Sequence, residues 1–157
     1  MANDSTMSVG RAGVSAPERP IVDLAAEPLV PVIGWEVEEH RGGGQLEWNP
    51  AQVELYFSFN QKDKKVIKGD ELREELNGQP VCNANLLDFL LANPRLIPEE
   101  WKHKRVYFWG TIYRRFSGNL CVRCLCWDGS RWNWDYNWLD GDFRDYSPAV
   151  LFASKIA

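Results

Sequence analysis

Three stretches in the second half of the chain alternate hydrophobic and polar side chains with the two-residue period of a β-strand. They cover residues 105–114, 120–127 and 131–139. Asp128-Gly129, between the second and the third, favours a tight hairpin because both residue types tolerate positive φ. The pattern predicts an antiparallel meander of three strands. Residues 52–59 alternate in the same way and can add a fourth strand at its edge.

The sequence predicts short helices before and after this meander. Residues 71–76 follow Asp70, a common N-cap residue type, and stop at Asn77-Gly78. Residues 86–92 follow cap candidates at Asn83 and Asn85 and are apolar nearly all round, so they should be buried. A short helical turn is predicted over residues 98–101, and a capped C-terminal helix over residues 147–152.

The lengths of the two turns decide which side chains share a face of the meander. With even turns, even-numbered residues of 105–114 and 131–139 lie beside odd-numbered residues of 120–127. Face one, defined in this way, carries Val106, Phe108, Gly110, Ile112, Cys121, Arg123, Leu125, Trp127, Trp132, Trp134, Tyr136 and Trp138. We expect the helix over 86–92 to cover face one. An odd turn would move a whole strand to the other face, face two.

These elements predict one α+β domain over residues 46–157, in which short helices pack on one face of a three- to four-stranded antiparallel meander. Residues 1–45 are interpreted as a flexible acidic arm, because Ser, Gly, Ala and Pro are mixed there without a period and Gly42-Gly43-Gly44 marks a hinge. The apolar run 29–33 leaves a short strand or a docking segment as alternatives. A chain without residues 1–45 is expected to fold.

Composition adds one unusual feature, the eight tryptophans, six of which lie between Trp101 and Trp138. Large aromatic side chains bury much apolar area, so a short chain can form a substantial core. The net charge of −4 is unevenly spread, because residues 1–50 hold eight acids and three bases, which gives −5, whereas the remaining residues give +1. No apolar run is long enough to span a bilayer and no secretion signal is present. We therefore expect a cytoplasmic protein without a membrane partner.

The four cysteines lack the spacing of a metal site or a disulfide framework. Cys124 and Cys126 point the same way along a strand, whereas Cys121 points away from them. Zinc needs about four converging ligands, and no histidine pair has finger-like spacing. We expect the cysteines to be reduced and to serve as small buried hydrophobic residues.

Catalytic patterns are also missing from the sequence. His103 lies among lysines and an arginine rather than beside a nucleophile, and no phosphate-binding loop is present. Asp140, Asp142 and Asp145 do not have the spacing of a calcium loop. We expect no cofactor and no metal, and we favour a protein that is not an enzyme.

Residues 102–131 form a basic and aromatic stretch, with seven bases and one acid. The candidate binding residues lie on face two and at its rim, and they are Tyr107, Trp109, Tyr113, Arg114, Arg115, Arg131, Asn133 and Asp135. Rings beside bases can clamp single-stranded nucleic acid, and rings beside Asn and Asp can hold a sugar. Two alternatives are structural. In the first, the bases only line the rim of the sheet and Arg123 stacks on Trp134. In the second, another layer of the fold covers the rings.

The absence of a catalytic pattern favours a non-catalytic binding or interaction protein, whose partner is another protein. A compact aromatic sheet and an acidic arm that orders on binding would suit this role. A single-stranded nucleic-acid binder and a carbohydrate-binding module are the alternatives. The oligomeric state does not follow from the sequence.

A set of short runs extends from Asn83 to Asp140. The runs read NANLLDFLLANP, LIPEEWK, FWGTIYR, VRCLCWDG and WLD. With the segments 61–64 and 69–76, they resemble a family of uncharacterised short bacterial proteins over residues 46–152. The resemblance implies no activity, cofactor or partner. In that family Tyr also occurs at the positions of Cys124 and Cys126, which argues further against a zinc site.

Overall fold

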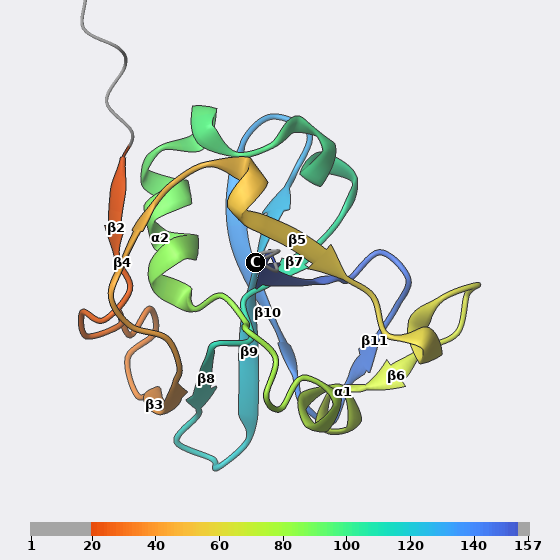
Figure 1. Cartoon of the computed structure of the whole chain (residues 1–157). Coiled ribbons are helices and arrows are strands. Elements are labelled where there is room, and N and C mark those ends of the chain that lie inside the picture. The colour runs from red at the N-terminus through yellow and green to blue at the C-terminus, as the bar shows by residue number, and fades with distance from the viewer. Residues whose placement is uncertain (1–19, 154–157) are drawn as a thin grey trace, which may run out of the picture.

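The computed structural model describes residues 20–153, and the first nineteen residues of the expected arm lie outside this range. Its main feature is a curled seven-stranded sheet (Figure 1). Six strands follow the order β3-β8-β9-β7-β12-β5, and the seventh, β10, also pairs with β9. The strands are β3 (Glu36–His40), β5 (Val53–Tyr56), β7 (Val106–Tyr107), β8 (Thr111–Arg114), β9 (Leu120–Trp127), β10 (Trp132–Trp138) and β12 (Ala149–Phe152). Two small sheets accompany it, namely β2 (Ile21–Asp23) with β4 (Gln45–Glu47) and β6 (Ile67–Lys68) with β11 (Asp142–Phe143).

The chain combines helices with sheet, but the expected three- to four-stranded antiparallel meander is wrong. β12 pairs in parallel with β7 and antiparallel with β5, so the large sheet is mixed. β12 occupies residues that were expected to form a C-terminal helix. Its run Ala-Val-Leu-Phe is apolar throughout and suits a buried strand as well as a helix. These residues form a strand because they lie between β7 and β5, whose backbone N–H and C=O groups need hydrogen-bond partners there.

The stretch expected as one strand over 105–114 is divided into β7 and β8. Tyr107 pairs with Cys124, whereas Tyr113 pairs with Cys121. From Tyr107 to Tyr113 the chain moves six positions, whereas the paired residues of β9 move only three. The extra residues form the break between β7 and β8 at 108–110. The connection from β8 to β9 has an odd length, since Arg114 pairs with Leu120. The expected assignment of faces is thus correct for β7 and wrong for β8, where Tyr113 lies on face one.

The hairpin from β9 to β10 confirms the predicted register. Trp127 pairs with Trp132 and Cys121 with Trp138, so odd residues of β9 share a face with even residues of β10. Asp128 closes the turn, because its Oδ1 accepts hydrogen bonds from the backbone N–H of Ser130 and of Arg131, both at 2.9 Å. These are local interactions within four residues, which explains why the sequence predicts them.

Two α-helices are described, α1 (Gly69–Glu75) and α2 (Ala84–Ala92), with four short 3-10 helices. The latter are η2 (Pro50–Gln52), η3 (Phe59–Gln61), η4 (Pro94–Leu96) and η5 (Glu99–His103). α1 starts before the expected Asp70 cap, and Lys68 precedes it without a side-chain cap. α2 is capped by Asn83, whose side chain accepts from Asn85 N at 3.1 Å. As predicted, α2 covers face one, where its leucines join a core with Val106, Phe108 and Leu125.

Face two is covered by a second layer, so the centre of the sheet is buried on both sides. Leu72 lies in α1 and Leu76 directly follows it, and Ile67 and Phe143 come from the small β6–β11 sheet. They form one core with rings and aliphatic chains of face two, namely Tyr107, Trp109, Val122, Cys124 and also Ile112. This layer comes from α1, β6 and β11, whereas 52–59 contributes only Tyr56 at its margin.

Residues 20–45, which were expected to belong to the flexible arm, pack against the sheet and α2. Val22, Leu24 and Trp35 are buried. The buried Asn83 amide donates to the carbonyl oxygens of Leu24 at 3.1 Å and Arg41 at 3.0 Å. The apolar run 29–33 is not a strand, but the Tyr113 hydroxyl donates to the Leu29 carbonyl at 2.8 Å. Residue 46 therefore does not mark the start of packing within the described part of the chain.

Candidate binding surface

Four partly exposed aromatic side chains line up on β10. Trp132, Trp134, Tyr136 and Trp138 point to one face of this strand, and each is half-buried. β10 pairs with β9 on one side only, so its rings have no further strand to cover them. Three of the rings touch in succession, with centroids 6.4 Å apart for Trp134 and Tyr136 and 5.2 Å apart for Tyr136 and Trp138, whereas the Trp132 ring contacts Trp127 of β9 at 5.4 Å.

Trp35 supports this row of rings from within the fold. It is buried, and its ring lies 6.1 Å from that of Trp134 and 5.1 Å from that of Tyr136, both edge to face. On its inner side it meets Tyr113 at 5.6 Å. Edge-to-face contacts of this kind favour defined ring orientations. The orientations of the Trp134 and Tyr136 rings are therefore defined before a partner binds.

The row continues past the end of β10 through a cation and two exposed apolar side chains. The Arg115 guanidinium lies 4.9 Å from the Trp138 ring centroid and 5.7 Å from that of Phe116. Phe116 is 81% exposed. Gly34 approaches its ring, and the neighbouring Ile33 is fully exposed. We call this set the aromatic surface, defined as Trp132, Trp134, Tyr136, Trp138, Arg115, Phe116 and Ile33.

The outer backbone edge of β10 is partly closed by its own side chains. Tyr136 N–H donates to the Asp135 carboxylate at 2.8 Å, and Trp138 N–H donates to the Asn137 amide oxygen at 2.9 Å. Side-chain closure of this kind opposes the addition of another strand. Recognition at β10 must therefore rely on the rings more than on backbone pairing.

The structure separates the eight residues that the sequence proposed for binding. Tyr107, Trp109 and Tyr113 are buried in the core, where no ligand ring can stack on them in this conformation. Arg114 pairs with Glu38 at 2.6 Å, at the edge next to β3. Arg115 belongs to the aromatic surface. The other three lie at or near β10: Arg131 is exposed, Asn133 donates to Asp128 at 2.7 Å, and Asp135 accepts from Arg105 at 2.5 Å.

The sequence placed the four rings of β10 on the core face, and α2 does cover face one of β9, although face two of β9 is buried as well. The difference is that α2 lies over β9 and only over part of β10. The sequence did indicate that these rings could be partly exposed, because the last strand of a hairpin meander lies at an edge unless a later segment pairs with it.

Next to the end of β9, the predicted bases line a hollow of about 450 Å³, which we call the basic hollow. Its lining residues are Lys102, His103, Lys104, Arg105, Cys126, Trp127, Asp128, Asp135 and Tyr146. The Lys102 ammonium lies 4.0 Å from the Trp127 ring centroid. This stacking is a cation–π arrangement, a type of contact that the sequence predicted only for Arg123 and Trp134.

The cysteines differ in their acidity because their surroundings differ. Burial raises the pKa of Cys121 to about 12, and it also raises the pKa values of Cys82 and Cys124. The pKa of Cys126 is lowered to about 7, chiefly because the Cys124 thiol hydrogen-bonds to it, with a contribution from the Arg105 charge. Three of the cysteines thus behave as buried thiols, as expected, and Cys126 does not.

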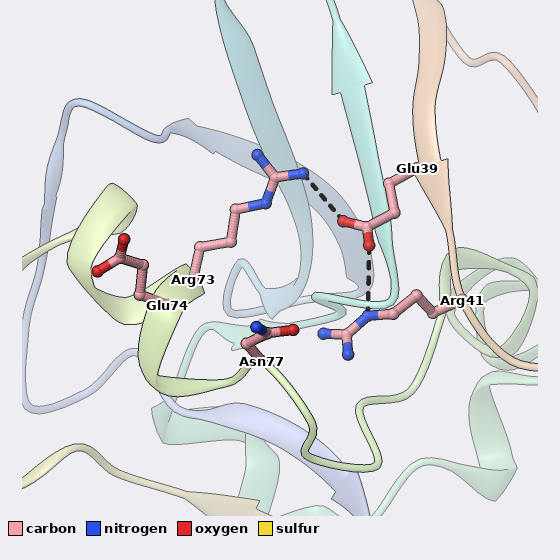
Figure 2. A pocket seen from close by; sticks show the side chains of 5 residues that line it. All are labelled: Glu39, Arg41, Arg73, Glu74 and Asn77. Carbon is pink, nitrogen blue, oxygen red and sulfur yellow. Dashed lines mark hydrogen bonds and ion pairs between the residues drawn. The ribbon is translucent and has the colours of Figure 1, made fainter.

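A second hollow, of about 260 Å³, lies between β3 and α1 (Figure 2). The Glu39 carboxylate stands between two arginines, 2.9 Å from Arg73 Nη2 and 3.7 Å from Arg41 Nε. The Arg41 side chain also donates to the Leu76 carbonyl at 3.4 Å. Glu39 thus forms ion pairs with both arginines and joins β3 to α1, although Arg41 Nε is buried without a hydrogen-bond partner.

Neither a metal site nor a spanning helix is found in the described residues. Among residues 20–153, no three His, Cys, Asp or Glu side chains gather closely enough to hold a metal ion. No helix in that range is both long and apolar enough to cross a bilayer. Comparison with protein-family models, with curated proteins and with solved structures gave no match. The resemblance to short bacterial proteins stays a prediction.

Proposed function

We propose that this protein is a non-catalytic binding protein that uses the aromatic surface to hold another protein. The observation that carries the proposal is the series of contacts along this surface, from the rings of Trp134, Tyr136 and Trp138 through Arg115 to the exposed Phe116. The exposed Ile33 precedes Gly34, which lies beside the Phe116 ring. Trp, Tyr and Arg are the residue types that most often dominate binding energy in protein interfaces.

Two further features support a protein as the partner. The rings are already oriented by Trp35, so binding would cost little ordering of side chains. The exposed Phe116 and Ile33 have no polar group to match a sugar hydroxyl or a phosphate, whereas an apolar pocket of a protein partner would bury them.

The test uses the full chain as bait to capture a protein partner from a cell lysate, and it compares two matched phenylalanine variants. Phe116→Ser removes a ring of the aromatic surface, and Phe59→Ser removes a ring that is 75% exposed elsewhere. We expect the wild type and Phe59→Ser to retain the same protein, and Phe116→Ser to bind it at least about tenfold more weakly. Equal retention by both variants, or no retained protein at all, would contradict the proposal.

A second candidate, binding of single-stranded nucleic acid, is favoured by one observation. Cations stack on rings near both ends of the row: Arg115 on Trp138, and Lys102 on Trp127 of β9, whose ring contacts Trp132. Bases stack on such rings while cations neutralise phosphates.

Salt dependence separates the two candidates. Nucleic-acid binding weakens steeply with salt because bound counterions are released from the phosphates. A labelled oligonucleotide is titrated at low and at high salt with the wild type and with Arg115→Gln. Micromolar binding that is lost at high salt and weakened by Arg115→Gln would replace the protein partner as the leading function. No binding at either salt concentration would remove this candidate.

A further inference from the structure

The basic hollow exposes one thiol to small molecules and buries a second thiol behind it. Cys126 lines the hollow and is half-buried, whereas Cys124, two residues earlier on the same face of β9, is fully buried. The volume of about 450 Å³ lies within the range of small-molecule sites. A reagent that enters the hollow therefore meets the Cys126 sulfur first.

Several charged and titratable groups face Cys126, and they come from every element around it. From β9 there is Cys124, whose thiol hydrogen-bonds to the Cys126 sulfur. The hollow is also lined by Arg105, His103 and the two lysines, by Asp135 of β10 and Asp128 of the turn, and by Tyr146. Tyr107 of β7 hydrogen-bonds to Cys124. The hydrogen bond and the Arg105 charge favour the thiolate more than burial and the two aspartates oppose it, so the pKa lies at about 7.

We propose that Cys126 is a site of S-thiolation, at which the protein reacts with low-molecular-weight disulfides. The Cys126 thiolate attacks one sulfur of the small disulfide, the S–S bond of that molecule breaks, and the second half leaves as a thiolate. One new S–S bond forms between Cys126 and the retained half. Cys126 is oxidised to the disulfide level and the leaving sulfur is reduced, so the reaction needs no other oxidant. A free small thiol reverses it.

Cys124 assists this reaction but does not complete it by forming a bond to Cys126. Two residues along a strand span about 6.6–6.8 Å between Cα atoms, at the upper limit for a disulfide. Burial also keeps Cys124 protonated, because it raises the pKa of that thiol. The mixed disulfide on Cys126 should therefore persist rather than resolve within the chain.

The thiolate fraction sets the size of the expected effect. At pH 7 a thiol with a pKa of about 7 is ionised about fiftyfold more than one with a pKa of 9, and its lower intrinsic nucleophilicity offsets about six- to tenfold of this gain. Access adds to the remaining difference, because the other three cysteines are buried. We expect Cys126 to react at least about tenfold faster than any of them.

The experiment treats the folded full chain with glutathione disulfide at pH 7 and locates the adduct by peptide mass mapping. Alkylation with uncharged iodoacetamide across pH 5–10 then gives the apparent pKa of Cys126 for the wild type, Cys124→Ala and, as a matched control, Cys121→Ala. We expect one glutathionyl group on Cys126, a midpoint near pH 7 that rises in Cys124→Ala, and no change in Cys121→Ala.

Three results would overturn the proposal. The first is an adduct spread over several cysteines of the wild type. The second is a wild-type midpoint near pH 9, a measurement that does not depend on whether either variant folds. The third is an intramolecular Cys124–Cys126 disulfide in place of the retained glutathionyl group. None of these results bears on the aromatic surface, so the proposed function is tested separately.

Discussion

Arg123 shows how a single charged residue can belong to the core of this fold. Its side chain is 1% exposed, yet it lies on β9 between the sheet and α2. Its guanidinium donates to both Asp88 carboxylate oxygens, at 3.0 and 3.1 Å, and stacks 4.4 Å from the Trp134 ring centroid. The stacking on Trp134 was expected from the sequence, whereas the bidentate partner on α2 was not.

Removal of the Asp88 carboxylate should therefore destabilise the protein strongly. Asp88→Ala leaves a buried guanidinium unpaired, and we expect the free energy of unfolding to fall by about 3 kcal/mol. The control is Glu38→Ala, which breaks the more exposed pair with Arg114 and should cost less than about 1 kcal/mol. Urea denaturation measures both values, and equal losses would show that burial of Arg123 does not matter.

Gly110 illustrates a residue fixed by close packing rather than by its backbone angles. A Cβ atom at this position would lie 2.8 Å from the Asn83 Cα and from the Cys82 carbonyl oxygen. Both obstacles are backbone atoms, which cannot move aside as a side chain can. This close approach joins the break between β7 and β8 to the start of α2.

We expect Gly110→Ala to lower the free energy of unfolding by about 3 kcal/mol through overpacking. Gly43→Ala is the matched control, because no atom lies within 4 Å of a Cβ there. Thermal and chemical denaturation of the two variants compares them directly. A Gly110→Ala protein as stable as Gly43→Ala would mean that α2 and the break can separate at little cost.

At the scale of elements, β5 and α1 are joined by one shared carboxylate. The Tyr56 hydroxyl donates to Glu75 Oε1 at 2.5 Å, and the Ser58 hydroxyl donates to Glu75 Oε2 at 2.9 Å. Burial, followed by the hydrogen bond to Glu75, raises the pKa of Tyr56 to about 12. Glu75 of α1 thus holds the edge strand β5 to the layer over face two through Tyr56 and Ser58.

This link should make stability fall at alkaline pH. The folded-state pKa of Tyr56 lies above its unfolded value of 10.0, so its contribution is complete below pH 10 and disappears as pH rises through about 12. We expect the difference in unfolding free energy between the wild type and Tyr56→Phe to shrink over this window. A difference that stays constant from pH 9 to pH 12 would assign the alkaline loss to other groups.

At the scale of the whole molecule, residues 20–45 complete the fold instead of preceding it. Trp35 fills the space between Tyr113 and the rings of β10, and β3 forms one edge of the large sheet. The buried Asn83 and the partly buried Asn85 both donate to the carbonyl oxygen of Leu24. Without this segment, two polar side chains of the α2 cap lose partners and the inner side of the aromatic surface is exposed.

A chain that begins at residue 46 should therefore be unstable compared with one that begins at Pro20. Burial of a large apolar side chain contributes about 1.5–3 kcal/mol, so loss of Val22, Leu24 and Trp35 together approaches the total stability of a typical domain. Near-UV circular dichroism during heating measures the outcome. A cooperative transition at the same temperature in both chains would instead support a domain boundary at residue 46.

The sequence by itself determined the parts of this protein that depend on neighbours within a few positions. Asp128 and Gly129 set the β9–β10 hairpin and its faces, and Asn83 with Asn93-Pro94 set the limits of α2. The apolar surface of α2 also required burial, and only the core side of the sheet could provide it. Each of these features follows from local hydrogen bonds or from one amphipathic pattern.

Only the tertiary structure decided which strands are neighbours, and this choice fixed the candidate site. Residues 149–152 are apolar enough for helix or strand, and the slot between β7 and β5 made them β12. The same long-range pairing left β10 at an edge, so its four rings are half-buried, while α1 and β11 closed over Tyr107 and Trp109. The residue types of the two sets of rings are alike. Their exposure differs because it depends on segments far away in the chain, which a local pattern does not specify.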